Sequence, residues 1–165
     1  MTTLNSSSQT VADAATGFAS SATFLAVAAA IGAGDVMTGA KEFSGIGPVA
    51  GGEVTIELSE MQIDAAALVA SEAGYTLHFY NVTPPSALAD NVAWDLPAGD
   101  RASYLGSIAL GTPVDLGASL RVEVKGIGKQ ITVPAGGSLF AYLETDAGFT
   151  ALADTRTVTI HSKRV

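Results

Sequence analysis

The stretch YTLHFYNVTPPSALADNVAWDLPAGDRASYLGSIAL, residues 75–110, decides how the rest of the chain is interpreted. Its first six residues carry large side chains on both faces, which is typical of an interior strand that is covered on both sides. Pro84 and Pro85 end this strand, because proline cannot donate a hydrogen bond to a β-ladder. A long loop with the single tryptophan, Trp94, follows, and strand character resumes at 104–110.

Working outward, the same alternation of apolar and polar residues predicts further short strands. The clearest is 53–59, where Val54, Ile56 and Leu58 share one face, and the loss of this phase afterwards predicts a bulge or strand end near Glu60. Leucine, phenylalanine and tyrosine on both faces make 139–143 a second interior strand. The other expected strands are 22–30, 36–46, a hairpin of 120–125 and 130–133 around the glycines of 126–128, and 155–161, the last strand in the chain, which closes the sheet.

Two short helices are also expected. Asp64 is a good N-cap, residues 65–73 contain good helix formers, and Gly74 is suited to the position after a helix. Pro97 is well placed to open a helical turn over 98–103.

Composition favours one all-β domain. The 165 residues suffice for a single core, and the chain is 48% hydrophobic but only 15% charged, with many Gly, Ala, Val, Thr and Ser residues. Short strands about ten residues apart with turn residues between them predict an antiparallel β-sandwich resembling a jelly roll. We therefore expect a sandwich domain over 22–165, preceded by an extended arm over 1–21.

The arm carries one charged residue, Asp13, and no sustained period. Two interpretations remain open: a frayed tail, or an arm that orders only against a neighbouring subunit. The sequence lacks the basic start of a secretory leader, and the apolar run 24–31 is too short to span a membrane, so we expect a soluble protein made without a cleaved leader.

Charge and cysteine content exclude several classes of function. The net charge of −8 opposes binding to nucleic acid, which depends on Lys and Arg. Because the chain has no cysteine, it has no disulfides, no thiolate nucleophile and no thiolate metal site.

No set of residues has the spacing of a catalytic or metal site. His78 and His161 stand apart without neighbouring ligands, and the sequence GIGKQ at 126–130 lacks the leading glycine of a phosphate-binding loop. Asp90, Asp95 and Asp100 do not follow a calcium-loop pattern, so we expect solvated or capping acids. Residues 81–83 match the N-glycosylation pattern, although nothing indicates a secretory route. We expect neither an enzyme, nor a cofactor, nor a metal.

Trp94 has two possible roles: to plug one end of the sandwich, or to anchor a contact with another subunit.

The chain resembles the decoration (cement) proteins of tailed-bacteriophage heads. The residues that carry this resemblance are Gly34-Asp35-Val36, Gly51-Gly52, the segment LHFYNVTPPSALADNVAWDL at 77–96, Tyr104-Leu105-Gly106, and the late strand 139–143. The segment 64–73 departs from the family, whose members are shorter there.

The resemblance implies a β-sandwich that assembles as a homotrimer on the outer surface of the capsid after synthesis in the host cytoplasm. Its partners would be the phage major capsid protein and further copies of itself, without nucleic acid or membrane. The implied contacts with the capsid or with other subunits are Thr2, Thr3, Leu4, Asn5, Pro84, Pro85 and Trp94.

Two other functions remain open at this point. The chain could be a β-domain of a tail tube or fibre, or a carbohydrate-binding module that uses Trp94, Tyr104 and the loop acids.

Overall fold

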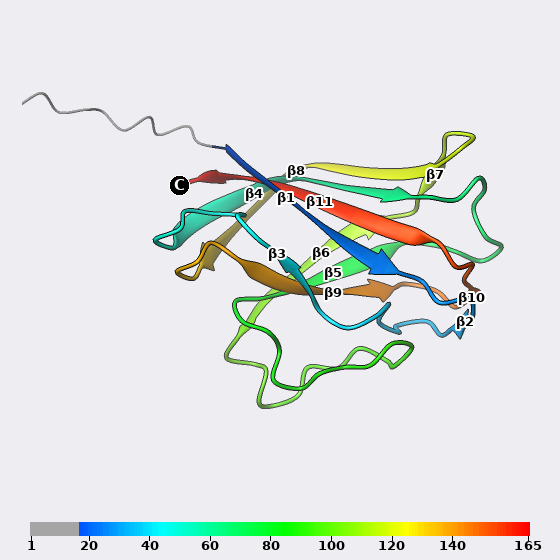
Figure 1. Ribbon diagram of the computed structural model, residues 1–165, viewed down its shortest axis with the longest axis horizontal. Coiled ribbons are helices and arrows are strands. Elements are labelled where there is room, and N and C mark those ends of the chain that lie inside the picture. The colour runs from blue at the N-terminus through cyan, green and yellow to red at the C-terminus, as the bar shows by residue number, and fades with distance from the viewer. Residues whose placement is uncertain (1–16) are drawn as a thin grey trace, which may run out of the picture.

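The computed structural model describes residues 17–165 and consists of two antiparallel β-sheets packed face to face, together with a small two-stranded ribbon (Figure 1). The predicted all-β sandwich class is thereby confirmed. The strands are β1 (Gly17–Leu25), β2 (Ala30–Ile31), β3 (Lys41–Phe43), β4 (Gly52–Ile63), β5 (Tyr75–Tyr80), β6 (Tyr104–Gly111), β7 (Val114–Asp115), β8 (Leu120–Val133), β9 (Leu139–Thr145), β10 (Phe149–Thr150) and β11 (Thr155–Arg164).

One sheet has the order β1-β11-β4-β8-β7, the other has the order β3-β9-β5-β6, and the ribbon pairs β10 with β2. Both strands predicted to be interior, at 75–80 and 139–143, are confirmed, because β5 lies between β9 and β6, and β9 lies between β3 and β5. The last strand predicted from the sequence, at 155–161, is present as β11. Strand β11 pairs with both β1 and β4, and its Val158 and Ile160 side chains are fully buried.

The core lies between the sheets and follows from the alternation in each strand. From β5, the side chains of Tyr75, Leu77 and Phe79 enter this core, while Tyr80 on the opposite face joins a second cluster with Tyr142 of β9. This second cluster lies on the outer face of the four-stranded sheet, under the β5–β6 loop. The loop therefore supplies a third layer on that side, which explains why β5 is apolar on both faces.

The sequence predicted either a bulge or a strand end near Glu60, and the structure has a bulge in β4. The strand continues to Ile63, and its irregularity lies at Glu57, between the partners of Ile56 and Leu58 on both neighbouring strands. The extra residue moves the buried phase from Ile56 to Ser59, so that Leu58 faces outward. The expected phase change is real, but it occurs three residues earlier.

The predicted hairpin within 120–133 is wrong, because these residues form the single strand β8. Gly126 and Gly128 take left-handed φ values of 67° and 63° and bend the strand without reversing it. Both halves pair with the long strand β4, from Leu120 opposite Ile63 to Val133 opposite Gly52. The glycine-bracketed turn was misleading because the pairing partner was unknown.

Neither expected helix is present in the described part of the chain. Residues 64–74 form an irregular loop, because Ser71 adopts a left-handed φ of 71° and the Glu72 carboxylate turns inward to a buried arginine instead of facing solvent. Residues 98–103 form successive turns closed on Asp100, whose carbonyl accepts hydrogen bonds from the amides of Ser103 and Tyr104.

The first two strands also differ from expectation. Strand β1 starts at Gly17 and ends at Leu25, so residues 17–21, assigned above to the arm, pair with β11. The arm residues 1–16 lie outside the described part of the chain. Of the strand expected over 36–46, only β3 is regular, since Asp35 and Val36 instead form single bridges to the long loop and to β9.

The connections gather at the two ends of the sandwich. Four loops, 26–34, 64–74, 112–119 and 146–154, lie at the end shown on the right of Figure 1. Gly17 and the C-terminal Val165 lie at the opposite end, where Gly17 pairs with Lys163 and the Val165 amide donates to the Glu53 carbonyl. Residues 17–165 contain no helix that is long and apolar enough to cross a membrane.

Candidate binding surfaces

The β5–β6 loop, residues 81–103, is anchored across the outer face of the four-stranded sheet. Its Asp90 carboxylate accepts a hydrogen bond from the Thr38 amide at 2.8 Å, and Tyr142 of β9 accepts one from the Leu88 amide at 3.0 Å. Backbone bonds join the loop to 34–36, where the Trp94 amide donates to the Gly34 carbonyl at 2.7 Å. The loop is therefore a fixed layer of the fold.

Under this loop lies a polar cluster centred on His78. Its Nε2 is 2.5 Å from the Glu144 carboxylate and its Nδ1 is 3.0 Å from the Tyr104 hydroxyl, while the indole of Trp94 stacks on the ring with 3.8 Å between centroids. Burial lowers the pKa of His78, although its hydrogen bond to Glu144 opposes this effect. The neutral ring thus donates from Nε2 to Glu144 and accepts from Tyr104 at Nδ1.

The cluster has the residue types of a proton relay, but its geometry serves packing. His78 is only 5% exposed, because Trp94 covers the ring. Two hollows in the surface of the described residues lie elsewhere: one of about 390 Å³ is lined by Glu53, Leu105 and their neighbours, and one of about 70 Å³ by Glu60, Arg121 and theirs. A substrate in either hollow would not contact the imidazole.

The residues proposed as contacts from the sequence are in different situations. Pro84 is buried and Pro85 is exposed where the long loop begins. Trp94 neither plugs an end of the sandwich nor stands free, since it is half-buried on the outer face of the sheet against His78. Residues Thr2, Thr3, Leu4 and Asn5 lie outside the described part of the chain.

The loop acids mainly bind backbone amides. Asp90 holds the Thr38 amide, Asp95 its own neighbour Leu96, and the buried Asp100 the Ser86 amide at 3.0 Å. Across residues 17–165, no three His, Asp or Glu side chains are grouped closely enough to hold a metal ion.

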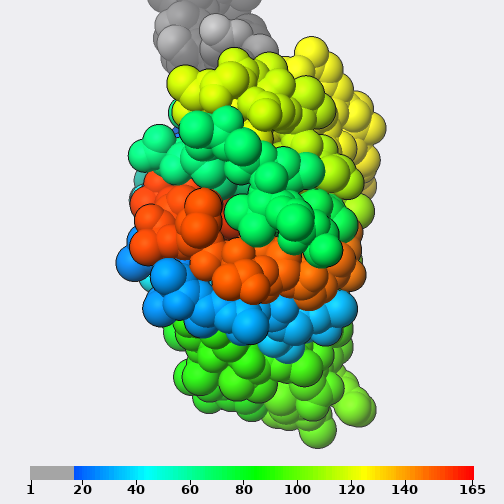
Figure 2. Space-filling view, turned by 90° about the vertical axis from the view of Figure 1, so that its right-hand side faces the viewer, coloured from blue at the N-terminus to red at the C-terminus, as the bar shows by residue number. Residues whose placement is uncertain are grey.

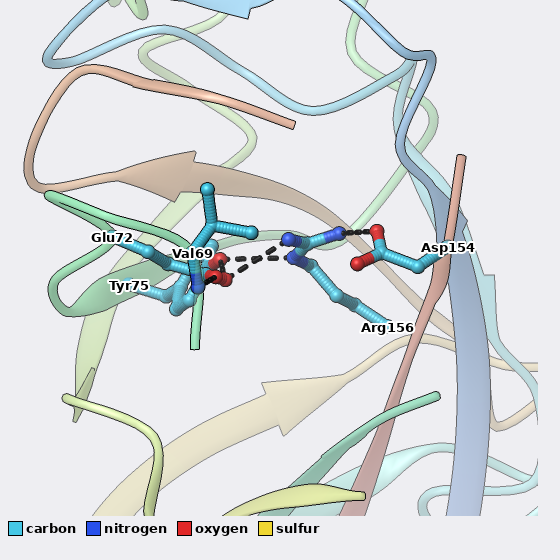
Figure 3. A network of polar contacts seen from close by, with 5 residues as sticks. All are labelled: Val69, Glu72, Tyr75, Asp154 and Arg156. Carbon is cyan, nitrogen blue, oxygen red and sulfur yellow. Dashed lines mark hydrogen bonds and ion pairs between the residues drawn. The ribbon is translucent and has the colours of Figure 1, made fainter. Parts of the chain in front are cut away.

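A second polar network is fully buried, beneath the loops at the right-hand end of Figure 1. Arg156 of β11 is 0% exposed and donates to the Tyr75 hydroxyl and to the Glu72 carboxylate, each at 2.9 Å, and to Asp154 (Figure 3). Tyr75 in turn donates to Glu72, whose second oxygen accepts from the Val69 amide at 3.3 Å. One arginine therefore ties the loops 64–74 and 146–154 to the core.

Electrostatics keep Tyr75 and Arg156 protonated. Burial raises the pKa of Tyr75, so its hydroxyl stays a donor. Burial alone would lower the pKa of Arg156, but its phenolic and carboxylate neighbours outweigh that effect and hold the pKa above its usual value. The guanidinium carbon also lies 5.6 Å from the ring centroid of Phe149 in β10.

Above this network, exposed apolar side chains gather at the end of the sandwich, which Figure 2 views directly. We call this surface the apolar end. Ten large hydrophobic side chains are exposed in residues 17–165, and six belong to the four loops or to the strand ends beside them. These six are Leu25, Val27, Leu68, Val114, Leu116 and Leu152, which are 37–62% exposed.

The apolar end also lacks positive charge. The four loops contain no Lys, Arg or His residue, and their exposed acids are Asp64, Asp115 and Asp146. Sequence reasoning missed this surface, because its residues are scattered over 130 positions and only the fold brings them together. The one available signal was the absence of cations from four separate Ala- and Gly-rich segments.

A scan against protein-family models finds no match to this chain, and a search of curated proteins finds no match either. Its function is therefore inferred from the fold and the surfaces described above.

Proposed function

We propose that the chain is a non-enzymatic structural protein of a virion, which binds the outside of an icosahedral phage head and cements neighbouring capsomers of the major capsid protein. The observation that carries this proposal is the apolar end. Contiguous apolar surface on a single chain costs solubility and commonly marks a protein–protein contact. A cement protein needs such surfaces, since it acts by binding neighbouring proteins of the shell.

The connectivity of the strands supports a jelly-roll sandwich within this proposal. With the short strands β2, β7 and β10 set aside, four strands remain in each sheet, and every connection except β5–β6 crosses between the sheets. The orders β1-β11-β4-β8 and β3-β9-β5-β6 are those of a double Greek key. Jelly rolls of this kind recur in viral capsid proteins, although fold alone does not determine function.

The anchored long loop suits the same role. Its exposed Pro85 and half-buried Trp94 lie on a loop that is tied to the sheet at several points, so a partner would meet a surface that is already ordered. Under the proposal these residues, together with Thr2–Asn5, contact the capsid or adjacent copies within a homotrimer.

Purified heads that lack this protein provide the test. The full chain should bind them at a fixed number of copies per capsomer and raise their resistance to heat, and electron microscopy should place it on the outer surface. Removal of residues 1–16, which leaves β1 intact, should weaken binding while the domain stays folded. Failure of the full chain to bind heads, or its appearance only on tails, would exclude the proposed function.

A further inference from the structure

From the apolar end we infer a specific docking surface for one kind of partner, a protein surface with an apolar centre and Lys or Arg residues at its rim. The inference rests on the proposed function only in taking this partner to be the shell protein. It goes further by naming the contact surface and its chemistry. It places the contact with the shell protein at the end of the sandwich opposite Gly17, Val165 and the start of the long loop.

The strand register makes the apolar end one surface. Leu25 pairs with Thr155, Ile63 lies opposite both Arg156 and Leu120, and Leu120 pairs with Asp115. The loops that follow these strand ends are therefore neighbours, as Figure 2 shows. Six half-exposed large side chains and exposed alanines on the same loops thus lie at one end of the sandwich, and apolar patches on protein surfaces are often functional.

Charge decides what can cover this surface. Glu72 and Asp154 are used by Arg156 inside the fold, which leaves Asp64, Asp115 and Asp146 exposed around the apolar side chains. One exposed arginine, Arg121, lies beside this surface as the strand partner of Val114, and its guanidinium is paired with Glu60 at 2.7 Å.

Two copies that met through the same end would therefore bring three carboxylates on each side together, which opposes a symmetric dimer. A partner with a cationic rim would complement them, and its association would be faster at low ionic strength.

The surface is ordered before it binds. Arg156 fixes the loop 64–74 through Glu72 and the loop 146–154 through Asp154, and it contacts the ring of Phe149. Phe149 in turn pairs with Ile31 and so connects the loop 26–34. One buried side chain thus positions three of the four loops. Loops that are already fixed lose less conformational entropy on association, so a modest apolar area suffices for specific binding.

The first experiment uses defined probes on the full chain. An amphipathic peptide of Leu and Lys should shift the amide resonances of 26–34, 64–74, 112–119 and 146–154, and should bind more weakly as salt is raised. Its Leu and Glu counterpart should bind at least tenfold more weakly. Equal binding of the two peptides, or shifts confined to other surfaces, would overturn the inference.

Variants then separate this surface from the rest of the molecule. The double variant Leu116→Ser/Leu152→Ser and the double variant Asp64→Lys/Asp115→Lys should each lower affinity for the Leu and Lys peptide at least tenfold. Their controls at the opposite end are Val49→Ser, at an even more exposed valine, and Glu42→Lys, and both should bind like the parent chain. All of these positions are exposed, so the variants should fold, which circular dichroism verifies.

Purified heads and sedimentation complete the test. Loss of head binding in the two double variants, with binding retained by the controls, supports the inference. Undiminished binding of the double variants to heads overturns the inference and leaves the proposed function intact. Failure of the parent chain to bind heads excludes the proposed function, and the peptide experiment then decides whether the surface binds a cationic partner. End-to-end self-association that disappears in Leu116→Ser/Leu152→Ser would assign the surface to a second copy and also overturn the inference.

Discussion

Replacing Arg156 by methionine is expected to destabilise the domain strongly. The substitution keeps most of the buried aliphatic stem, but it removes the only cation that faces the Glu72 and Asp154 carboxylates. Breaking a fully buried ion pair in this way costs about 3–5 kcal/mol, because the two carboxylates that remain have no cation to balance their charge and no water around them. For a domain of this size the loss corresponds to a fall in melting temperature of roughly 6–20 °C.

Thermal and urea unfolding followed by circular dichroism measures this loss, and two further variants identify its cause. Arg121→Met removes an exposed pair with Glu60 and should cost less than about 1 kcal/mol. The triple variant Arg156→Met/Glu72→Gln/Asp154→Asn, which removes the stranded charges as well, should regain about 2 kcal/mol of the loss. If Arg156→Met costs no more than Arg121→Met, or if the triple variant is as unstable as the single one, then the buried charges do not stabilise the loops as described.

Three other predictions concern the cluster at His78, the long loop and strand β8. Burial lowers the pKa of His78, so its imidazole should titrate below 6.5 in NMR spectra. As the pH falls below about 6.5, the unfolded chain takes up this proton before the folded chain does, so the free energy of unfolding should decrease. The variant His78→Gln should lack this component of the pH dependence. A His78 resonance that titrates above 6.5 would reverse the sign. Trp94→Ala should lower the free energy of unfolding by about 2 kcal/mol and speed hydrogen exchange of the amides that pair 91–94 with 34–36. Val92→Ala, at an exposed side chain, should change neither quantity. Equal effects of the two variants would show that the indole does not hold the loop. Gly126→Ala should lower the free energy of unfolding, measured by urea titration, by about 1–2 kcal/mol. The left-handed φ of 67° alone causes this loss, since no atom lies within 4 Å of the added Cβ. Gly99→Ala has equal space and no such φ, so it should be nearly neutral in the same titration.

Local patterns in the sequence predicted the class of fold well. Strand β5 was recognised because large side chains on both faces fit only an interior strand, and Leu139–Leu143 was recognised for the same reason. The Pro pair marked the start of the long loop. In each case the deciding interaction lies within a few residues, so the pattern contains it.

Errors occurred where a distant partner decides the conformation. Residues 64–73 have helix-forming composition, but Arg156, more than 80 positions away, draws Glu72 inward and the segment stays irregular. Gly126 and Gly128 read as a turn because the length of β4, which pairs with both sides of them, had no local signature. The bulge at Glu57 was predicted three residues too late, near Glu60, because Leu58 is apolar and yet faces outward.

The candidate binding surface shows the same division. From the sequence alone came the two-layer β class, the interior strands, and a composition rich in Gly and Ala with little charge. Only the tertiary structure determined that four loops meet at one end, that their exposed leucines and valines form one surface, and that a single buried arginine positions three of these loops. The physical reason is that strand alternation is set by neighbours two residues apart, whereas a surface is set by which strand ends lie side by side, and that depends on the pairing of the whole sheet.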